Sequence, residues 1–225
     1  MSFADKKLSE IAISIPGSTA LLREYDLDFC CGGADTLGAA VAEKNLNLAE
    51  IEARLTELQN SKKQDDEQRW LTAPYADIIE HIIHRYHERH KQQLSELFVL
   101  AERVESVHGD RDDCPIGIAA EIQNIYSDLS SHMMKEEQIL FPMINMGNYA
   151  MARMPIQVME HEHAEHGEHL DVLKALTNNL TLPADACNTW RALYSGIQEF
   201  MDDLMMHIHT ENNILFPRVI EEGSR

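Results

Sequence analysis

The chain has 225 residues, with 38 acidic and 19 basic side chains and a formal net charge of −19. This length suffices for one large domain, or for a medium domain together with a small one. So negative a surface repels phosphate backbones and anionic lipid, which excludes nucleic acid and membrane surfaces as partners. No apolar run approaches the ~20 residues that cross a bilayer.

Cysteine and histidine are distributed unevenly. The first residues, MSFADKKLSEIAISIPG, lack the apolar run of a secretory signal, and four cysteines are too few for a disulfide scaffold. We therefore expect a cytoplasmic, reducing environment. All twelve histidines lie between His81 and His209, which divides the chain into two chemically different parts. Four of them, His108, His161, His169 and His209, are expected at surfaces or edges.

Residues 1–58 are expected to form a small helical domain. Proline, glycine and polar residues separate short apolar patterns, and Asn47 is suited to cap the last helix. The expected helices cover about residues 7–15, 18–25, 36–44 and 47–58. The segment Asp28-Phe29-Cys30-Cys31-Gly32-Gly33 is expected to be a loop, because two adjacent glycines favour a tight or left-handed backbone. Residues 59–70, mostly polar and charged, are expected to be a linker.

Residues 71–225 show the pattern of four long helices. The first is expected from Pro74 to about Val107, the second from about Pro115 to Leu140, the third from near Pro155 to before Asn178, and the fourth from after Pro183 to Leu215. Long helices joined by short or medium connections pack as antiparallel neighbours. The sequence thus predicts an all-α protein, an antiparallel four-helix bundle preceded by a small helical domain.

An internal repeat relates the two halves of this bundle. The motif His-x-x-x-Glu-x-x-Ile-Leu-Phe-Pro begins at His132 and recurs at His207. A second motif, His-x-x-His, begins at His87 and recurs, at nearly the same offset, at His163. We expect two helical hairpins related by a pseudo-twofold, with one shared site that receives equivalent side chains from both.

These repeated residues interrupt stripes of otherwise apolar side chains. His132 and Glu136, one helical turn apart, lie in such a stripe, and so do His207 and Glu211. A buried carboxylate is costly unless a cation compensates it, so a pair of metal ions explains the pattern. Imidazole and carboxylate ligands suit iron, with zinc, manganese and cobalt as alternatives. Helix geometry alone leaves the choice between His87 and His90, and between His163 and His166, open.

The chain resembles the hemerythrin-like bundles, and more closely the iron-sulfur cluster repair di-iron proteins of the repair of iron centres family. The resemblance rests on the stretch from Ser131 to Pro142, on Glu211 to Pro217 and on the Cys-Cys-Gly-Gly loop, and it covers nearly the whole chain. It implies two non-haem, carboxylate-bridged iron ions. The ligands that it implies are His87, His132, Glu136, His163, His207 and Glu211. Around them we expect a second layer of residues: His84, His90, Glu162, Glu165 and His166.

Two departures separate this chain from the oxygen-carrying hemerythrins. Their third helix has His-x-x-x-His, whereas Gly167 stands at that spacing after His163, and their last motif is His-x-x-x-x-Asp, whereas Glu211 follows His207 after three residues. Reversible oxygen storage is therefore not expected. A site more open to external ligands such as nitric oxide or oxygen is favoured.

Cys30 and Cys31 allow two interpretations. Adjacent cysteines close a strained ring when oxidised, so a structural disulfide is not expected. On a glycine loop they are candidates for a thiol site that transfers metal, nitrosyl or persulfide groups. The alternative is that they are two small packing residues.

The expected function is repair of iron-sulfur clusters damaged by nitrosative or oxidative stress. Two chemistries stay open: donation of iron to damaged client proteins, and reduction of nitric oxide at the diferrous centre, so whether the chain is an enzyme is also open. The alternative function is a hemerythrin-like oxygen or redox sensor or an iron store. A homodimer is compatible with all of these.

Overall fold

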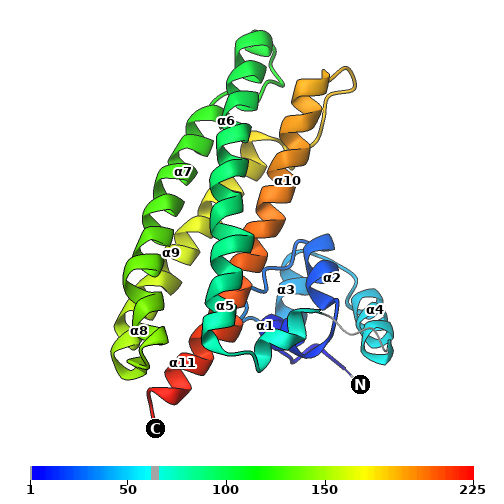
Figure 1. The fold of residues 1–225 in the computed structure, drawn as a ribbon. Coiled ribbons are helices and arrows are strands. Elements are labelled where there is room, and N and C mark those ends of the chain that lie inside the picture. The colour runs from blue at the N-terminus through cyan, green and yellow to red at the C-terminus, as the bar shows by residue number, and fades with distance from the viewer. Residues whose placement is uncertain (1, 62–65) are drawn as a thin grey trace.

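The computed structural model describes residues 2–61 and 66–225, which are helical without a β-strand (Figure 1). The all-α prediction is confirmed. None of the helices in the described ranges has the length and apolar character to cross a membrane. The N-terminal elements are α1 (Leu8–Ser14), α2 (Ser18–Glu24), α3 (Leu37–Glu43), α4 (Leu48–Asn60) and the 3-10 helix η1 (Asp66–Leu71).

Side-chain caps start two of the short helices. Thr36 Oγ1 accepts a hydrogen bond from the backbone N–H of Ala39 at the start of α3. Asn47 Oδ1 accepts one from Glu50 at the start of α4, in the capping role that the sequence predicts. Both ends of the predicted linker, residues 59–70, are helical in the structure, because α4 continues to Asn60 and η1 occupies residues 66–71. Its middle, residues 62–65, lies outside the described residues.

Four long helical columns make the bundle (Figure 1). The elements of the first are α5 (Tyr75–Ile82), the π-helical segment η2 (Ile83–His87) and α6 (Glu88–His108). The second contains α7 (Ile118–Lys135), π-helical η3 (Glu136–Leu140) and α8 (Phe141–Asn145). The third is α9 (Tyr149–Leu176). The fourth contains α10 (Asn188–His209), π-helical η4 (Thr210–Leu215) and α11 (Phe216–Glu222).

Three prolines lie within helical columns where the sequence suggested ends or starts. Pro142 and Pro217 follow the π-helical segments η3 and η4 and occupy the first turn of α8 and α11, where proline needs no N–H partner. Pro155 lies inside α9, which begins earlier than predicted, at Tyr149. The carbonyl that Pro155 leaves without a helical donor belongs to Met151, whose side chain is exposed, so water can reach this face.

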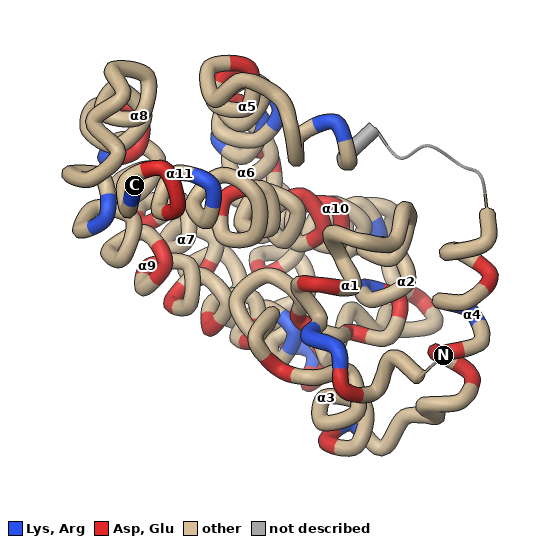
Figure 2. Tube along the Cα trace, turned by 90° about the horizontal axis from the view of Figure 1, so that it is seen from below, with Lys and Arg blue, Asp and Glu red and all other residues tan. Residues whose placement is uncertain are grey.

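The N-terminal helices and one end of the bundle share a hydrophobic core. Buried Phe3, Leu22 and Phe29 belong to the same cluster as Phe141 and Phe216 of the bundle. Figure 1 shows α1 beside the end of the column that α10 begins, and α1 contacts η4. A second cluster fills the rest of the bundle. Acidic residues are spread over most elements (Figure 2), in keeping with the charge of −19.

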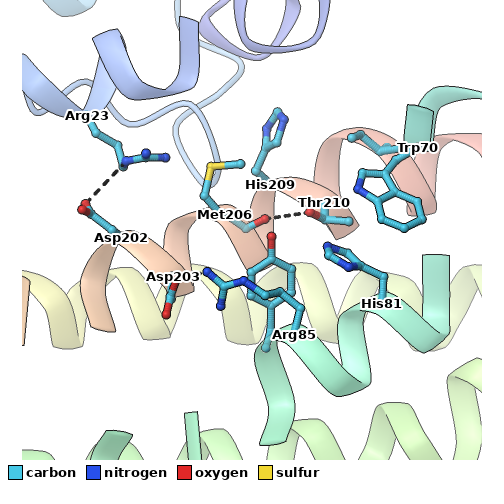
Figure 3. A pocket seen from close by; sticks show the side chains of 11 residues that line it. Arg23, Trp70, His81, Arg85, Asp202, Asp203, Met206, His209 and Thr210 are labelled. Atoms are coloured by element: carbon cyan, nitrogen blue, oxygen red, sulfur yellow. Dashed lines mark hydrogen bonds and ion pairs between the residues drawn. The ribbon is translucent and has the colours of Figure 1, made fainter. Parts of the chain in front are cut away.

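A cavity of about 260 Å³ lies where α2 and η1 meet α5 and α10 (Figure 3). Arg23 faces Asp202 across it, with Nε 3.5 Å from Oδ1. On the opposite side the ring of His81 stacks on Trp70, with centroids 4.3 Å apart. The cavity therefore marks the seam between the N-terminal helices and the bundle.

Candidate metal centre

The bundle brings the six predicted ligand residues together in its interior. All six side chains are at most 1% exposed; they are His87, His132, Glu136, His163, His207 and Glu211. Three of them lie in π-helical segments, His87 in η2, Glu136 in η3 and Glu211 in η4. A π-helical turn has one more residue than an α-helical one and is frequent at functional sites, because it redirects the side chains that follow.

The six side chains form two groups that share both glutamates. In each group, one potential ligand atom per residue lies within 4.8 Å of the others. The first contains His87 and His207 with Glu136 and Glu211, and the second contains His132 and His163 with the same two glutamates. Two sites with two carboxylates in common have the composition of a bridged metal pair.

The distances between donor atoms fit ligands of common ions. The Nε2 atoms of His87 and His207 are 3.2 Å apart, and those of His132 and His163 are 3.0 Å apart. Each Nε2 also lies 3.1 to 3.5 Å from a glutamate oxygen. Two ligands about 2.1 Å from the same ion at right angles are about 3 Å apart.

The two glutamates lack hydrogen-bond donors that would stabilise their buried carboxylates. Both carboxylate oxygens of Glu136 and of Glu211 are buried and have no hydrogen-bond partner. Buried polar atoms are nearly always paired, and an unpaired buried carboxylate costs several kcal/mol. The donor set present in the chain therefore fits a pair of metal ions.

Three of the four histidines are oriented by hydrogen bonds from Nδ1. His87 is 2.9 Å from Glu137 Oε1, His132 is 2.9 Å from Glu162 Oε2, and His163 is 2.8 Å from Asn212 Oδ1. Since these oxygens accept, Nδ1 carries the proton and Nε2 presents its lone pair to the site. Of these three acceptors, only Glu162 was expected from the sequence; Glu137 and Asn212 were not, although both directly follow a repeated glutamate.

The other expected second-layer residues divide into two classes. His90 and His166 are buried beside His207 and His132, with ring centroids 5.3 and 4.9 Å apart, and the Nε2 atom of each has no partner. His84, in contrast, is exposed and bonds to Glu88 on the outside of the bundle.

Glu165 is also exposed, and it pairs with His161, with 3.7 Å between His161 Nε2 and Glu165 Oε1. The expectation for both residues was wrong. Glu165 follows His163 by two residues, which turns its side chain to the opposite face of α9. His84 lies on the outward-facing side of the first helical column, because the wider π-helical turn of η2 separates it from the face of His87 more than an α-helical turn would.

His209 was expected at a surface or edge, but it is buried. Its ring meets Phe29 at 5.2 Å, and its Nδ1 is 2.8 Å from Asn213 Nδ2. Burial lowers its pKa to about 4. The N-terminal segment covers this face of α10, and the periodicity of the bundle alone gives no signal for such a contact.

The pKa values of the four histidines are shifted in different directions in the metal-free site. Burial opposes protonation of His163, but the carboxylate of Glu211, with Oε2 3.1 Å from Nε2, outweighs it and raises the pKa of His163 to about 9. The pKa of His87 is raised in the same way, with Glu136 overcoming burial. Burial lowers the pKa of His132 and of His207. Each histidine pair therefore combines one ring whose protonation the neighbouring glutamate favours with one ring whose protonation burial opposes.

The cysteine loop lies against His163, one of the predicted ligand histidines. Cys31 Sγ donates to the backbone carbonyl of His163 at 3.2 Å, and the two sulfurs are 3.8 Å apart, as free thiols. Asp28 Oδ1 accepts hydrogen bonds from the backbone N–H groups of Cys30 and Cys31. The hydrogen bond with Cys31, together with burial, raises the pKa of Cys30. The structure thus brings the predicted thiol site next to the predicted metal site.

Comparisons with known proteins agree with this architecture. Residues 78–219 match the family of the hemerythrin HHE cation binding domain, and residues 4–59 match a domain of unknown function (DUF542). The chain is 66% identical over 222 residues to the probable iron-sulfur cluster repair protein of Haemophilus influenzae, covering 99% of this chain and 100% of that one.

Two further relatives carry the name iron-sulfur cluster repair protein YtfE. The protein of Musicola paradisiaca is 56% identical over 220 residues, 98% of each chain. The protein of Escherichia coli O81 is 53% identical over 220 residues, 98% of this chain and 99% of that one. Such identity over the full length is decisive. The chain belongs to the family of iron-sulfur cluster repair proteins, with a hemerythrin-like cation-binding domain.

Proposed function

We propose that the chain holds two iron ions and uses this centre to repair iron-sulfur clusters damaged by nitrosative or oxidative stress. In this proposal His87 and His207 bind one ion, His132 and His163 bind the other, and Glu136 and Glu211 bridge them. The observation that carries the proposal is the sharing of both unpaired, buried glutamates between two histidine pairs. The names of the relatives support repair as the purpose of such a centre.

The donor set supports iron as the metal. Four imidazoles and two carboxylates suit iron, and with few ligands on each ion, external ligands can still bind. The hydrogen bonds at Nδ1 of His87, His132 and His163 hold these rings in the tautomer that leaves Nε2 available. The apolar core around the site limits access of water.

Metal analysis tests the centre itself. The wild-type protein, reconstituted anaerobically with ferrous iron and desalted, is expected to retain two irons per chain. The double variant Glu136→Ala/Glu211→Ala is expected to retain less than one. The matched control is Glu165→Ala/Glu168→Ala, which removes two carboxylates of α9 that lie outside the centre. Retention of fewer than two irons by the wild type, or of two by the first variant, contradicts the proposal.

Delivery of iron is the first of two proposed routes to repair. Iron is the cargo here, and the partly exposed Cys31 beside His163 is suited to pass it to an acceptor. The protein loaded with labelled iron is mixed with an apo iron-sulfur acceptor, and the label is followed. Transfer is expected to fall in Cys30→Ala/Cys31→Ala and to be unchanged in Cys114→Ala/Cys187→Ala. Equal transfer by both double variants removes the thiol role.

Reduction of nitric oxide is the second route. A ferrous pair supplies two electrons, which convert two nitric oxide molecules and two protons into nitrous oxide and water. The residues of the chain would position the two reacting molecules, and protonated carboxyl groups near the site would supply the two protons. A single-turnover assay of the diferrous protein is expected to yield about one nitrous oxide per chain, and absence of nitrous oxide eliminates this route.

The cellular location is proposed on the chemistry of the thiols. All four cysteines are free. Free thiols of this kind persist in the reducing cytoplasm, where iron-sulfur proteins damaged by nitric oxide or oxygen would be the clients.

A further inference from the structure

The internal repeat gives the two halves of the centre equivalent ligands but different supports. Glu137 and Asn212 occupy the same repeat position, each directly after the repeated glutamate. Glu137 Oε1 accepts from Nδ1 of His87 at 2.9 Å, and Asn212 Oδ1 accepts from Nδ1 of His163 at 2.8 Å. A carboxylate can only accept, whereas an amide also carries two N–H donors. Asn212 can therefore also donate to a backbone carbonyl, which Glu137 cannot.

The second connection of Asn212 reaches the thiol loop. Its Nδ2 donates to the backbone carbonyl of Cys30 at 3.3 Å. This orientation of the amide is the one that satisfies both neighbours, because the carbonyl of Cys30 can only accept and Nδ1 of His163 donates. One side chain thus bridges a residue of the thiol site and a residue of the metal site.

Two other contacts hold the same loop without using a ligand imidazole. Asn213 Nδ2 donates to the carbonyl of Phe29 at 2.8 Å, and Cys31 Sγ donates to the carbonyl of His163 at 3.2 Å. Both reach backbone atoms, which binding of a metal at Nε2 does not polarise directly. Among these contacts, only that of Asn212 joins the loop to the imidazole ring of His163, so only it responds directly when a metal ion binds to that ring.

We propose that Asn212 is a positioning residue that couples metal occupancy at the His132–His163 pair to the placement of the Cys30–Cys31 loop. The inference rests on the proposed metal centre. A metal ion at Nε2 of His163 would fix the position of the ring and keep its remaining proton on Nδ1, which fixes the Asn212 amide and with it the hydrogen bond to Cys30. The His87–His207 pair lacks this route, because the carboxylate of Glu137 has no N–H group to donate to the loop.

Thiol alkylation measures this coupling directly. Each protein is treated anaerobically with iodoacetamide, metal-free and at saturating ferrous iron, and modification of Cys30 and Cys31 is followed by peptide mass spectrometry. In the wild type, iron is expected to slow their alkylation about two- to tenfold, the equilibrium worth of one hydrogen bond. Cys187 serves as the internal reference for reagent activity.

Three variants separate coupling from structural loosening. Asn212→Asp keeps an acceptor for His163 but loses the donor to Cys30, so it is expected to bind iron while the ratio of the two alkylation rates falls to about one. Glu137→Gln, at the equivalent repeat position, binds iron more weakly but is expected to keep the wild-type ratio once the iron concentration is raised enough to saturate it. Asn213→Ala loosens the loop in both states, which raises both rates and leaves their ratio intact.

Each outcome is decisive for the coupling. The coupling is overturned if Asn212→Asp shows the same ratio of alkylation rates as the wild type, or if Glu137→Gln loses the ratio as well. It is also overturned if the wild type, with two irons bound, shows a ratio of one. Iron analysis of the same samples separates this failure from failure of the proposed centre, since the latter shows as missing iron in the wild type. Should Asn212→Asp unfold, as judged by circular dichroism, Asn212→Ser replaces it with the same expected loss.

Discussion

Gly167 faces the sulfur of Cys31: a Cβ atom built on the glycine would lie 3.8 Å from Sγ. Gly167 stands where the oxygen-carrying hemerythrins have a second histidine in their third helix, one turn after the ligand position of His163. In this chain the space beside that turn is occupied by the thiol loop instead. The absence of a side chain at position 167 and the docking of Cys31 are thus two aspects of one arrangement.

A graded pair of substitutions at position 167 tests this arrangement. Gly167→Ala adds a methyl group at ordinary contact distance and is expected to stabilise α9 by about 0.5–1 kcal/mol without changing the thiols. Gly167→Leu needs the space of Cys31 and is expected to raise the alkylation rate of Cys31 about tenfold, as if the loop were released. The control is Ala164→Leu, an exposed position on the same helix. Equal rates in Gly167→Leu and the control contradict the arrangement.

The carboxylates that orient two of the proposed ligand histidines should affect iron affinity. Glu137→Gln and Glu162→Gln each replace a charged acceptor by a neutral one, and the iron affinity is expected to fall about 10- to 100-fold in each. Competition with a chelator of known affinity gives the value. Glu165→Gln, on the exposed face of α9, is the control and should bind iron as the wild type does. A loss in the control equal to that in Glu162→Gln would assign the effect to overall charge.

The stability of the protein should depend on pH through His81. Burial against Trp70, together with the charges of Arg69 and Arg85, lowers the pKa of His81 to about 4. Between that value and the ordinary 6.5 the unfolded chain binds a proton that the folded chain does not, so this residue makes stability rise with pH across the window and lowers it on acidification.

His81→Phe keeps the stacking on Trp70 and removes the titration. Urea unfolding of the metal-free protein at pH 4.5 and pH 7 is expected to show a smaller loss of stability on acidification in this variant than in the wild type. His161→Phe, at an exposed site, should leave the loss unchanged. An identical loss in wild type and His81→Phe would show that His81 does not contribute.

Arg218 fastens the start of the first bundle column to the last helix. Its two terminal nitrogens donate to the carbonyls of Trp70 and Ala73, both at 2.8 Å, and its guanidinium lies over the ring of Tyr75. Arg218→Lys keeps the charge but cannot span both carbonyls, and it is expected to lower the free energy of unfolding by about 1–2 kcal/mol. Thermal unfolding measures the change, and the exposed Arg153→Lys is the control, expected to be neutral.

The sequence predicts the bundle and four of the six buried candidates, the two His–Glu pairs, because these depend on local periodicity. A histidine and a glutamate one turn apart in an apolar stripe must face the core, whatever the tertiary details. Helix geometry does not distinguish His87 from His90, and that choice came from the family resemblance. In the structure, the atoms of His87 and His163 lie within the clusters, whereas His90 and His166 stand beside them.

What the sequence missed depends on contacts between distant segments. Asn212 and Glu137 acquire their roles from the packing of one column on another, and His209 is buried by a loop close to the opposite end of the chain. The positions of Pro142 and Pro217 suggested helix ends, but each lies in the first turn of a helix that resumes after a π-helical segment. These features have no periodic signature, and they decide how the site is supported.

The hydrophobic cluster common to the N-terminal helices and the bundle end bears on how deletion experiments should be read. A shortened protein that begins at the bundle would lose Cys30 and Cys31 and, at the same time, uncover side chains such as His209 that rely on Phe29 for their cover. Such a fragment would be prone to aggregate and less stable, and its failure to act could not be ascribed to missing sulfur. Point substitutions within the intact chain are the informative route.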